Sequence, residues 1–295
     1  MQDVYPIIEL LWSSSVIAAV QQFFGPAWLP FFLALTQLGT LQLTVVVVSL
    51  LLWWQGRGPA YFALGLSALS LAIALLLKSL VVVLRPHGPE ITIYQPAFDS
   101  AFPSGHAAVA AGLWGAMAAW GLLPLTLAAA IVLGVMLSRL YLGVHFLGDV
   151  IVGGALGLAL VAIVSWAYPR LKLAFAQRPP WQYGLPLGAA AVLWAIFVLP
   201  SASQGWDILG GILGLAIAIP LEARYVGYRP VAGRWQWQLV KTVTGLTTLG
   251  ALIGAAIVVG QANAFISAGA YFLAVLWVFL IAPALYQRVE VPAAA

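Results

Sequence analysis

The sequence predicts an all-α protein, a polytopic membrane helix bundle with about nine transmembrane helices and an N-terminal interfacial helix. Hydrophobic residues make up 63% of the 295 residues and charged residues only 7%, and the mean hydropathy is +1.04. Soluble domains carry about 25% charged residues. The apolar runs recur along the whole chain and are continuous rather than alternating, which argues against a transmembrane β-barrel.

The composition also excludes some classes of function. The chain has no cysteine, so disulfide and thiol chemistry are absent. Its net charge of +4 is the balance of twelve Lys and Arg and eight Asp and Glu, and the basic residues form no basic stripe, so a nucleic-acid partner is not expected. The apolar composition makes the lipid bilayer the expected partner. The first residues, MQDVYPIIELLWSSS, lack a basic segment and do not predict a cleaved signal peptide.

The N-terminal stretch 6–24 is apolar but carries Glu9, Gln21 and Gln22, which predicts a helix that lies at the membrane interface. Gly25 and Pro26 end this stretch, and further Pro and Gly residues separate the spans that follow. The predicted spans are 30–54, 60–84, 104–122, 125–142, 146–168, 183–200, 206–221, 239–261 and 264–286.

The basic residues predict the orientation of these spans. Most of them fall on one side of the predicted bundle, which the positive-inside rule makes cytoplasmic, with the N-terminus outside and the C-terminus inside. The expected location is a bacterial inner (plasma) membrane, with the functional site described below facing the periplasm. The basic residues on the cytoplasmic side are Arg57, Arg170, Lys172, Arg178, Arg224, Arg229, Arg234, Lys241 and Arg288.

The other three basic residues, Lys78, Arg85 and Arg139, fall toward the outer face. Ionisable groups inside a membrane are costly and therefore indicate function. Lys78 and Arg85 are seven residues apart, or about two helical turns, which predicts that both lie on one stripe of the helix 60–84.

Two short segments add acid–base groups at the same face. Pro103 and Ser104 predict a helix start, which would leave free N–H groups at Ser104, Gly105 and His106, and such groups bind phosphate. Farther on, His145 and Asp149 are about one turn apart. The carboxylate can then accept the Nδ1–H of His145, which leaves Nε2 free to attack phosphorus while the other histidine protonates the leaving oxygen.

Together these segments resemble the three-part signature of the type 2 phosphatidic acid phosphatase superfamily, over residues 30–170. The segments are Lys78-x6-Arg85-Pro86, Pro103-Ser104-Gly105-His106 and Ser138-Arg139-x5-His145-x3-Asp149. The resemblance implies a phosphohistidine on His145, with Asp149 as its partner and His106 as the general acid. It implies no metal and no other cofactor. The phosphate-binding residues it implies are Lys78, Arg85, Ser104, Gly105 and Arg139.

One position departs from the family pattern. Many members have a second arginine in the first motif, RPRP, where this chain has RPHG, so His87 becomes a candidate for substrate contact. In the outer loop 85–103, Glu90, Tyr94 and Asp99 could also gate or contact substrate, or form an ordinary solvated loop. A metal site at His106, His145 and Asp149 is an alternative, but three nearby cations would repel a metal ion.

The predicted organisation is an interfacial helix at 1–28, a catalytic membrane core at 29–170 and a four-helix membrane extension of unknown role at 171–295. The predicted function is a metal-independent membrane phosphatase that acts on a lipid phosphate or diphosphate at the outer face. Candidate substrates are a polyprenyl diphosphate, phosphatidic acid, phosphatidylglycerophosphate and a sphingoid phosphate. The alternatives are a phosphotransferase with the same site, an enzyme similar to glucose-6-phosphatase that acts on a soluble sugar phosphate, and a non-enzymatic lipid transporter.

Overall fold

The computed structural model of the chain describes residues 9–176, 184–197, 205–231, 235–260 and 263–290, with residues 179 and 182. Within these ranges every regular element is a helix, which confirms the all-α prediction. Residues 1–8 of the predicted N-terminal segment 1–28, and Arg178 and Arg234, lie outside the described residues. The chain divides into two compact units, which are described separately: unit 1 is Met1–Val48 and Pro59–Arg170, and unit 2 is Ser49–Gly58 and Leu171–Ala295.

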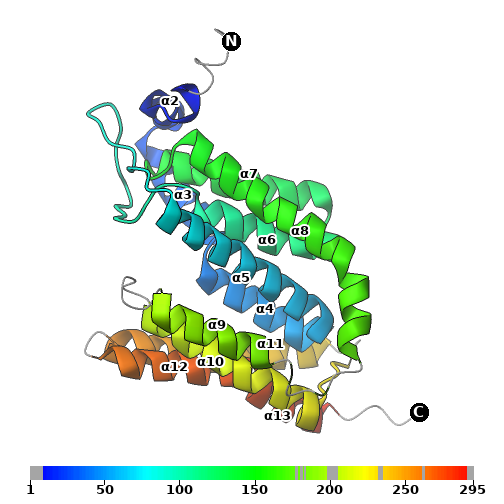
Figure 1. Cartoon of the computed structure of the whole chain (residues 1–295). Coiled ribbons are helices and arrows are strands. Elements are labelled where there is room, and N and C mark those ends of the chain that lie inside the picture. The colour runs from blue at the N-terminus through cyan, green and yellow to red at the C-terminus, as the bar shows by residue number, and fades with distance from the viewer. Residues whose placement is uncertain are drawn as a thin grey trace. The chain divides into compact units, whose positions relative to one another are not determined.

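Unit 1 contains the three signature segments (Figure 1). Helix α7 contacts α2, α3 and α6. The helices that contribute to the unit are α2 (Ser14–Phe24), η1 (Pro26–Trp28), α3 (Leu29–Gln37), α4 (Leu41–Gln55), α5 (Arg57–Leu80), α6 (Gly105–Ala119), α7 (Leu125–Tyr141) and α8 (Leu147–Ala176).

The predicted number of about nine spans is not confirmed. Within the described ranges, four helical stretches are long and apolar enough to cross a bilayer, and α2 with Pro26–Gln37 would be a fifth if this pair, bent by 86°, counts as one span. The predicted first span is broken: α3 ends at Gln37 and α4 begins at Leu41. The four long stretches are Arg57–Leu80, Leu147–Arg170, Gly205–Val226 and Ala264–Val289.

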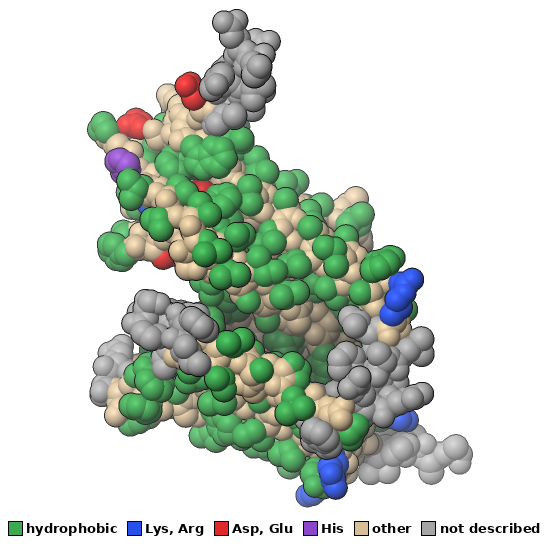
Figure 2. Space-filling view, in the orientation of Figure 1, with side chains coloured by type: hydrophobic (Ala, Val, Ile, Leu, Met, Phe, Trp, Pro, Cys, Tyr) green, Lys and Arg blue, Asp and Glu red, His purple; other side chains and the backbone are tan. Residues whose placement is uncertain are grey.

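Large apolar side chains remain exposed on α7 and α8. Leu133, Leu158 and Trp166 are exposed, and Figure 2 shows hydrophobic side chains over much of the visible surface of these helices. Exposed apolar side chains are unfavourable in water and favourable against lipid tails. This surface agrees with the chain being an integral membrane protein.

Two glycines let α8 lie close against α6. A Cβ built on Gly153 would lie 2.4 Å from the Ser104 carbonyl oxygen, and one on Gly157 would lie 2.5 Å from that of Ala108. Small residues four positions apart commonly allow such close contact between membrane helices. The contact fixes the start of α6, which carries Ser104 and His106, against the first turn of α8, which carries Asp149.

Gly157→Ala is expected to destabilise unit 1, because the added methyl group must push α6 and α8 apart. Overpacking of this kind costs about 1–3 kcal/mol, and the melting temperature in detergent should fall accordingly. The matched control is Gly65→Ala in α5, where a Cβ would meet nothing within 4 Å. Helix propensity alone should make the control neutral or slightly stabilising. Equal melting temperatures for the two variants would contradict the close packing.

The loop 81–104 is held in place by the N-terminal helix. The Gln21 amide of α2 donates to the Thr92 carbonyl (2.7 Å) and the Tyr141 carbonyl (2.8 Å), and it accepts from the Thr92 N–H (2.9 Å). The Tyr94 ring stacks on the Tyr141 ring with centroids 5.5 Å apart. These contacts fix a segment that has no helix or strand of its own.

Unit 2 is a second helical group. Helix α10 packs against α9 and α12, and α11 packs against α12. A buried Lys241–Glu290 ion pair of 2.6 Å joins α11 to the end of α13. Lys241 also donates to the Trp53 carbonyl (2.7 Å), so the end of α4 belongs to this unit. The remaining elements are α9 (Gly184–Phe197), α10 (Gly205–Leu221), η3 (Glu222–Val226), α11 (Trp235–Gly260), α12 (Ala264–Leu276), η4 (Trp277–Ile281) and α13 (Ala282–Val289).

Candidate active site

The first signature segment lies only partly on a helix. Lys78 is in the last turn of α5, but α5 ends at Leu80, so Arg85 lies in the extended segment that follows. The prediction that both cations share one helical stripe is therefore wrong. The residue before a proline is disfavoured in a helix, and Arg85 precedes Pro86. Three consecutive β-branched residues, 81–83, also favour the extended chain.

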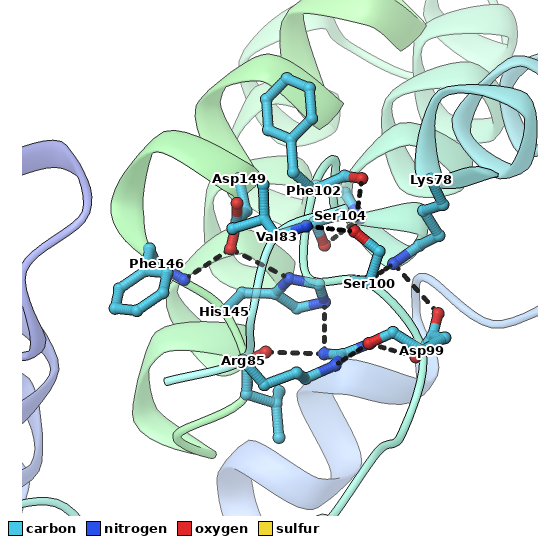
Figure 3. Close-up of polar contacts among 12 residues, drawn as sticks. Lys78, Val83, Arg85, Asp99, Ser100, Phe102, Ser104, His145, Phe146 and Asp149 are labelled. Atoms are coloured by element: carbon cyan, nitrogen blue, oxygen red, sulfur yellow. Dashed lines mark hydrogen bonds and ion pairs between the residues drawn. The ribbon is translucent and has the colours of Figure 1, made fainter. Parts of the chain in front are cut away.

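The extended segment brings Arg85 back to the site through the loop. The Ala101 N–H donates to the Val83 carbonyl (2.9 Å), and the Val83 N–H donates to Ser100 Oγ (3.0 Å). Arg85 Nη1 then donates to the Val144 carbonyl (2.6 Å) and lies 3.2 Å from His145 Nε2 (Figure 3). The structure thus brings Arg85 to His145 by a different backbone path from the one predicted.

The second segment begins α6 where the sequence predicts a helix start. Ser104 is the N-cap, and its Oγ accepts from the Ala107 N–H. The Ser104 N–H is not free as predicted, because it donates to the Asp149 carbonyl at 3.0 Å. The N–H groups of Gly105 and His106 follow in the first turn, where no intrahelical acceptor exists. The His106 side chain interacts electrostatically with the cationic side chains of Arg139, Arg85 and Lys78.

The third segment brings His145 and Asp149 together. His145 Nδ1 lies 3.5 Å from Asp149 Oδ2, at ion-pair distance but without the predicted hydrogen bond, and the same oxygen accepts from the Phe146 N–H at 2.8 Å (Figure 3). The side chains are 2% and 0% exposed. Burial, together with the charges of Arg85 and Arg139, holds the pKa of His145 well below its ordinary value. The imidazole is therefore neutral at pH 7, and a neutral imidazole keeps the lone pair that a nucleophile needs.

Arg139, in the last turn of α7, is held by residues outside the signature. Its Nη1 donates to Thr36 Oγ1 (2.8 Å) and lies 3.2 Å from Gln95 Oε1. The guanidinium is almost fully buried. Nothing in the sequence spacing points to Thr36 or Gln95, because their contacts depend on the path of α3 and of the loop.

His87 is placed differently from the other predicted residues. Its side chain is exposed, and its Nδ1 lies 3.0 Å from the Arg85 carbonyl oxygen. Asp99, on the other hand, contacts two of the predicted phosphate-binding cations, Lys78 and Arg85 (Figure 3). Over the part of the chain that the structure describes, no group of three or more His, Cys, Asp or Glu is arranged to hold a metal ion.

Comparisons with known proteins agree with these motifs. Phosphatidylglycerophosphatase B of Escherichia coli K12 is 39% identical over 100 residues, which is 32% of this chain and 37% of that protein. The same protein of Shigella flexneri matches equally. This chain thus matches little more than a third of the length of these curated relatives. A crystal structure of a transmembrane PAP2-type phosphatidylglycerolphosphate phosphatase from Bacillus subtilis is 23% identical, with a TM-score of 0.46, over 53% of this chain and 84% of that one.

Two family models match consecutive parts of the chain, the first mostly within unit 1 and the second within unit 2. The model described as the PAP2 superfamily matches residues 59–173, which include all three signature segments. The model described as a PAP2 superfamily phosphatase, transmembrane extension, matches residues 206–294. The resemblance found in the motifs is confirmed, and the chain belongs to the PAP2 superfamily.

Proposed function

We propose that the protein is a metal-independent membrane phosphatase that hydrolyses a lipid phosphate or diphosphate through a phosphohistidine at His145. The observation that carries the proposal is the surrounding of His145: a carboxylate lies at Nδ1 and a guanidinium at Nε2. A carboxylate at Nδ1 fixes the tautomer that presents the Nε2 lone pair. A cation at Nε2 suits a site that receives an anionic phosphoryl group.

The chemistry proceeds in two balanced steps. His145 Nε2 attacks phosphorus, the bond from phosphorus to the leaving oxygen breaks, and His106, in its imidazolium form, gives that oxygen a proton and becomes neutral. Water then attacks the phosphohistidine, the P–N bond breaks, and His106 takes the proton of the water. Arg85, Lys78 and Arg139 stabilise the negative charge on the phosphoryl oxygens in both transition states. The N–H groups of Gly105 and His106 add neutral donors at the start of α6.

The surroundings of the cations favour a lipid over a soluble sugar phosphate. Leu80, Val82 and Leu84, between Lys78 and Arg85 along the chain, are 70–80% exposed, and Phe98, next to Asp99, is fully exposed. Apolar side chains beside a phosphate site suit a headgroup whose tail stays in the membrane. The curated relatives are phosphatidylglycerophosphatases by name, so phosphatidylglycerophosphate is the first candidate substrate.

We also propose that the site faces the periplasm of a bacterial inner membrane. The charge pattern supports this orientation, since most basic residues fall on the opposite side of the predicted bundle. Residues 171–295 are proposed to be a membrane extension of the catalytic core rather than a second catalytic unit. Cysteines introduced at Phe98 and Arg288, labelled from outside in intact cells, test the orientation: only the cysteine at 98 should react.

Phosphate release by the purified protein in EDTA tests the function. The panel is phosphatidylglycerophosphate, phosphatidic acid, a polyprenyl diphosphate, a sphingoid phosphate and glucose 6-phosphate. We expect release from at least one lipid, unchanged by EDTA, and little from glucose 6-phosphate. Loss of activity in EDTA would contradict the metal-independent mechanism. Labelled phosphate that reaches His145 without release would favour a phosphotransferase. If neither labelling nor release occurs, the non-enzymatic transporter becomes the better assignment.

A further inference from the structure

Asp99 pairs with both cations of the first signature segment. Its Oδ1 lies 2.5 Å from Arg85 Nη2 and its Oδ2 lies 3.1 Å from Lys78 Nζ. The Arg85 Nε–H also donates to the Asp99 carbonyl oxygen at 3.1 Å. One loop residue thus binds two of the side chains that are proposed to bind phosphate, and no part of the catalytic chemistry above uses it.

A carboxylate and a phosphate compete for the same donors. Both present pairs of anionic oxygens, and both form charge-assisted hydrogen bonds with Arg and Lys. Arg85 Nη2 and Lys78 Nζ cannot give the same hydrogen bonds to a phosphate while they give them to Asp99. A phosphate that takes the N–H groups now directed at Asp99 therefore displaces the Asp99 carboxylate.

The burial of the three side chains shows which partner is able to leave. Lys78 is 10% exposed and Arg85 is 16% exposed, whereas Asp99 is 54% exposed. The Asp99 side chain can thus rotate so that its carboxylate faces the solvent, while the two cations stay in place. Its burial works to raise its pKa, but Lys78 and Arg85 outweigh this and lower the pKa below that of an ordinary aspartate. The carboxylate therefore stays ionised at neutral pH.

We propose that Asp99 is an internal competitor that determines which anions occupy the site at the concentrations found in a membrane. The proposal rests on the proposed function, because it takes Lys78 and Arg85 as phosphate ligands. An internal competitor lowers the apparent affinity of every anion that must displace it, and it does so by one common factor. Weakly bound, singly charged phosphodiester lipids then fail to occupy the site even in excess. A phosphomonoester or diphosphate, with about two negative charges or more, still binds.

The test is Asp99→Asn, which keeps the shape of the side chain and removes its charge. We expect the KM for dioctanoyl phosphatidic acid to fall about fivefold, the order expected for loss of a partly exposed ion pair. The inhibition constants of dioctanoyl phosphatidylglycerol, a single anion, and of sulfate, a double anion, should fall by the same factor. The control is Glu90→Gln in the same loop, because Glu90 is bonded to Ser14 and not to the cations.

The direction in which KM and the inhibition constants change in Asp99→Asn separates competition from a purely structural role. If Asp99 only orders the loop, its loss should weaken the binding of all three anions, and that result would overturn the proposal, as would unchanged constants. The proposal is also overturned if the change in these constants grows with the charge of the anion, or if Glu90→Gln gives the same change. Asp99 would then contribute only to the overall electrostatic potential at the site. Asp99→Ser serves as the second variant should Asp99→Asn melt at a much lower temperature.

A binding measurement makes the proposal independent of turnover. In a His145→Ala background, sulfate should raise the melting temperature more when Asp99→Asn is added than when Glu90→Gln is added. If the unmodified protein hydrolyses nothing on the panel but this difference appears, the phosphatase assignment fails and the role of Asp99 stands. If hydrolysis occurs and the difference is absent, the role of Asp99 fails and the phosphatase stands.

Discussion

His145→Ala is expected to abolish phosphate release, with a loss of about 10⁴-fold or more in kcat, the order seen when a covalent nucleophile is removed. The variant removes Nε2, the proposed attacking atom, which lies next to the Arg85 guanidinium. Phosphate release should be measured at saturating substrate. In a parallel experiment, labelled phosphate on the protein should be trapped by quenching the reaction without acid. The label should appear on the unmodified protein and be absent from the variant.

The melting temperature of His145→Ala separates loss of chemistry from loss of fold. His145 is buried, so the variant leaves a cavity and should melt somewhat earlier. A variant that still binds sulfate but does not turn over has lost the nucleophile alone. Residual activity above about 1% of the original value would mean that another group attacks phosphorus.

Asp149→Asn is expected to lower kcat by about 10²–10⁴-fold with a much smaller effect on KM. The asparagine keeps the size of the side chain but not the negative charge that fixes the Nδ1–H tautomer of His145 and stabilises its positive charge. The Phe146 N–H should still find an oxygen acceptor. Steady-state kinetics, with kcat and KM determined separately, is the measurement.

Asp207→Asn is the matched control for this variant. Asp207 also lies in the first turn of a helix, α10, where its side chain bonds to Ser267 of α12. It belongs to unit 2, outside the signature, so its loss should affect stability without a selective loss of kcat. An equal loss of kcat in both variants would mean that Asp149 supports the fold rather than the histidine.

Local spacing predicted some contacts in the site well. His145 and Asp149 are four residues apart, and their side chains meet across the beginning of α8. Ser104 caps α6 where the Pro103–Ser104 pair predicts a helix start. Both results follow from short-range geometry, in which one turn of chain fixes the relation between the groups.

Other features could not be predicted because they depend on long-range contacts or on competing local preferences. A helix period assigned to 60–84 put Lys78 and Arg85 on one stripe, but Val81–Val83 and Pro86 favour an extended chain, and α5 stops at Leu80. The Ser104 N–H was expected to be free, yet the close approach of α8 at Gly153 gives it the Asp149 carbonyl. Asp99 lies near the cations only because of the path of the loop.

The contacts of Gln21 and Thr36 have a consequence for how this protein can be shortened. The PAP2 match begins at residue 59, yet Gln21 holds the loop through Thr92 and Tyr141, and Thr36 holds Arg139. A fragment cut at the boundary of the match would contain every signature residue and lack these two supports. A fragment that keeps both supports must therefore begin before Gln21, well ahead of the first signature residue.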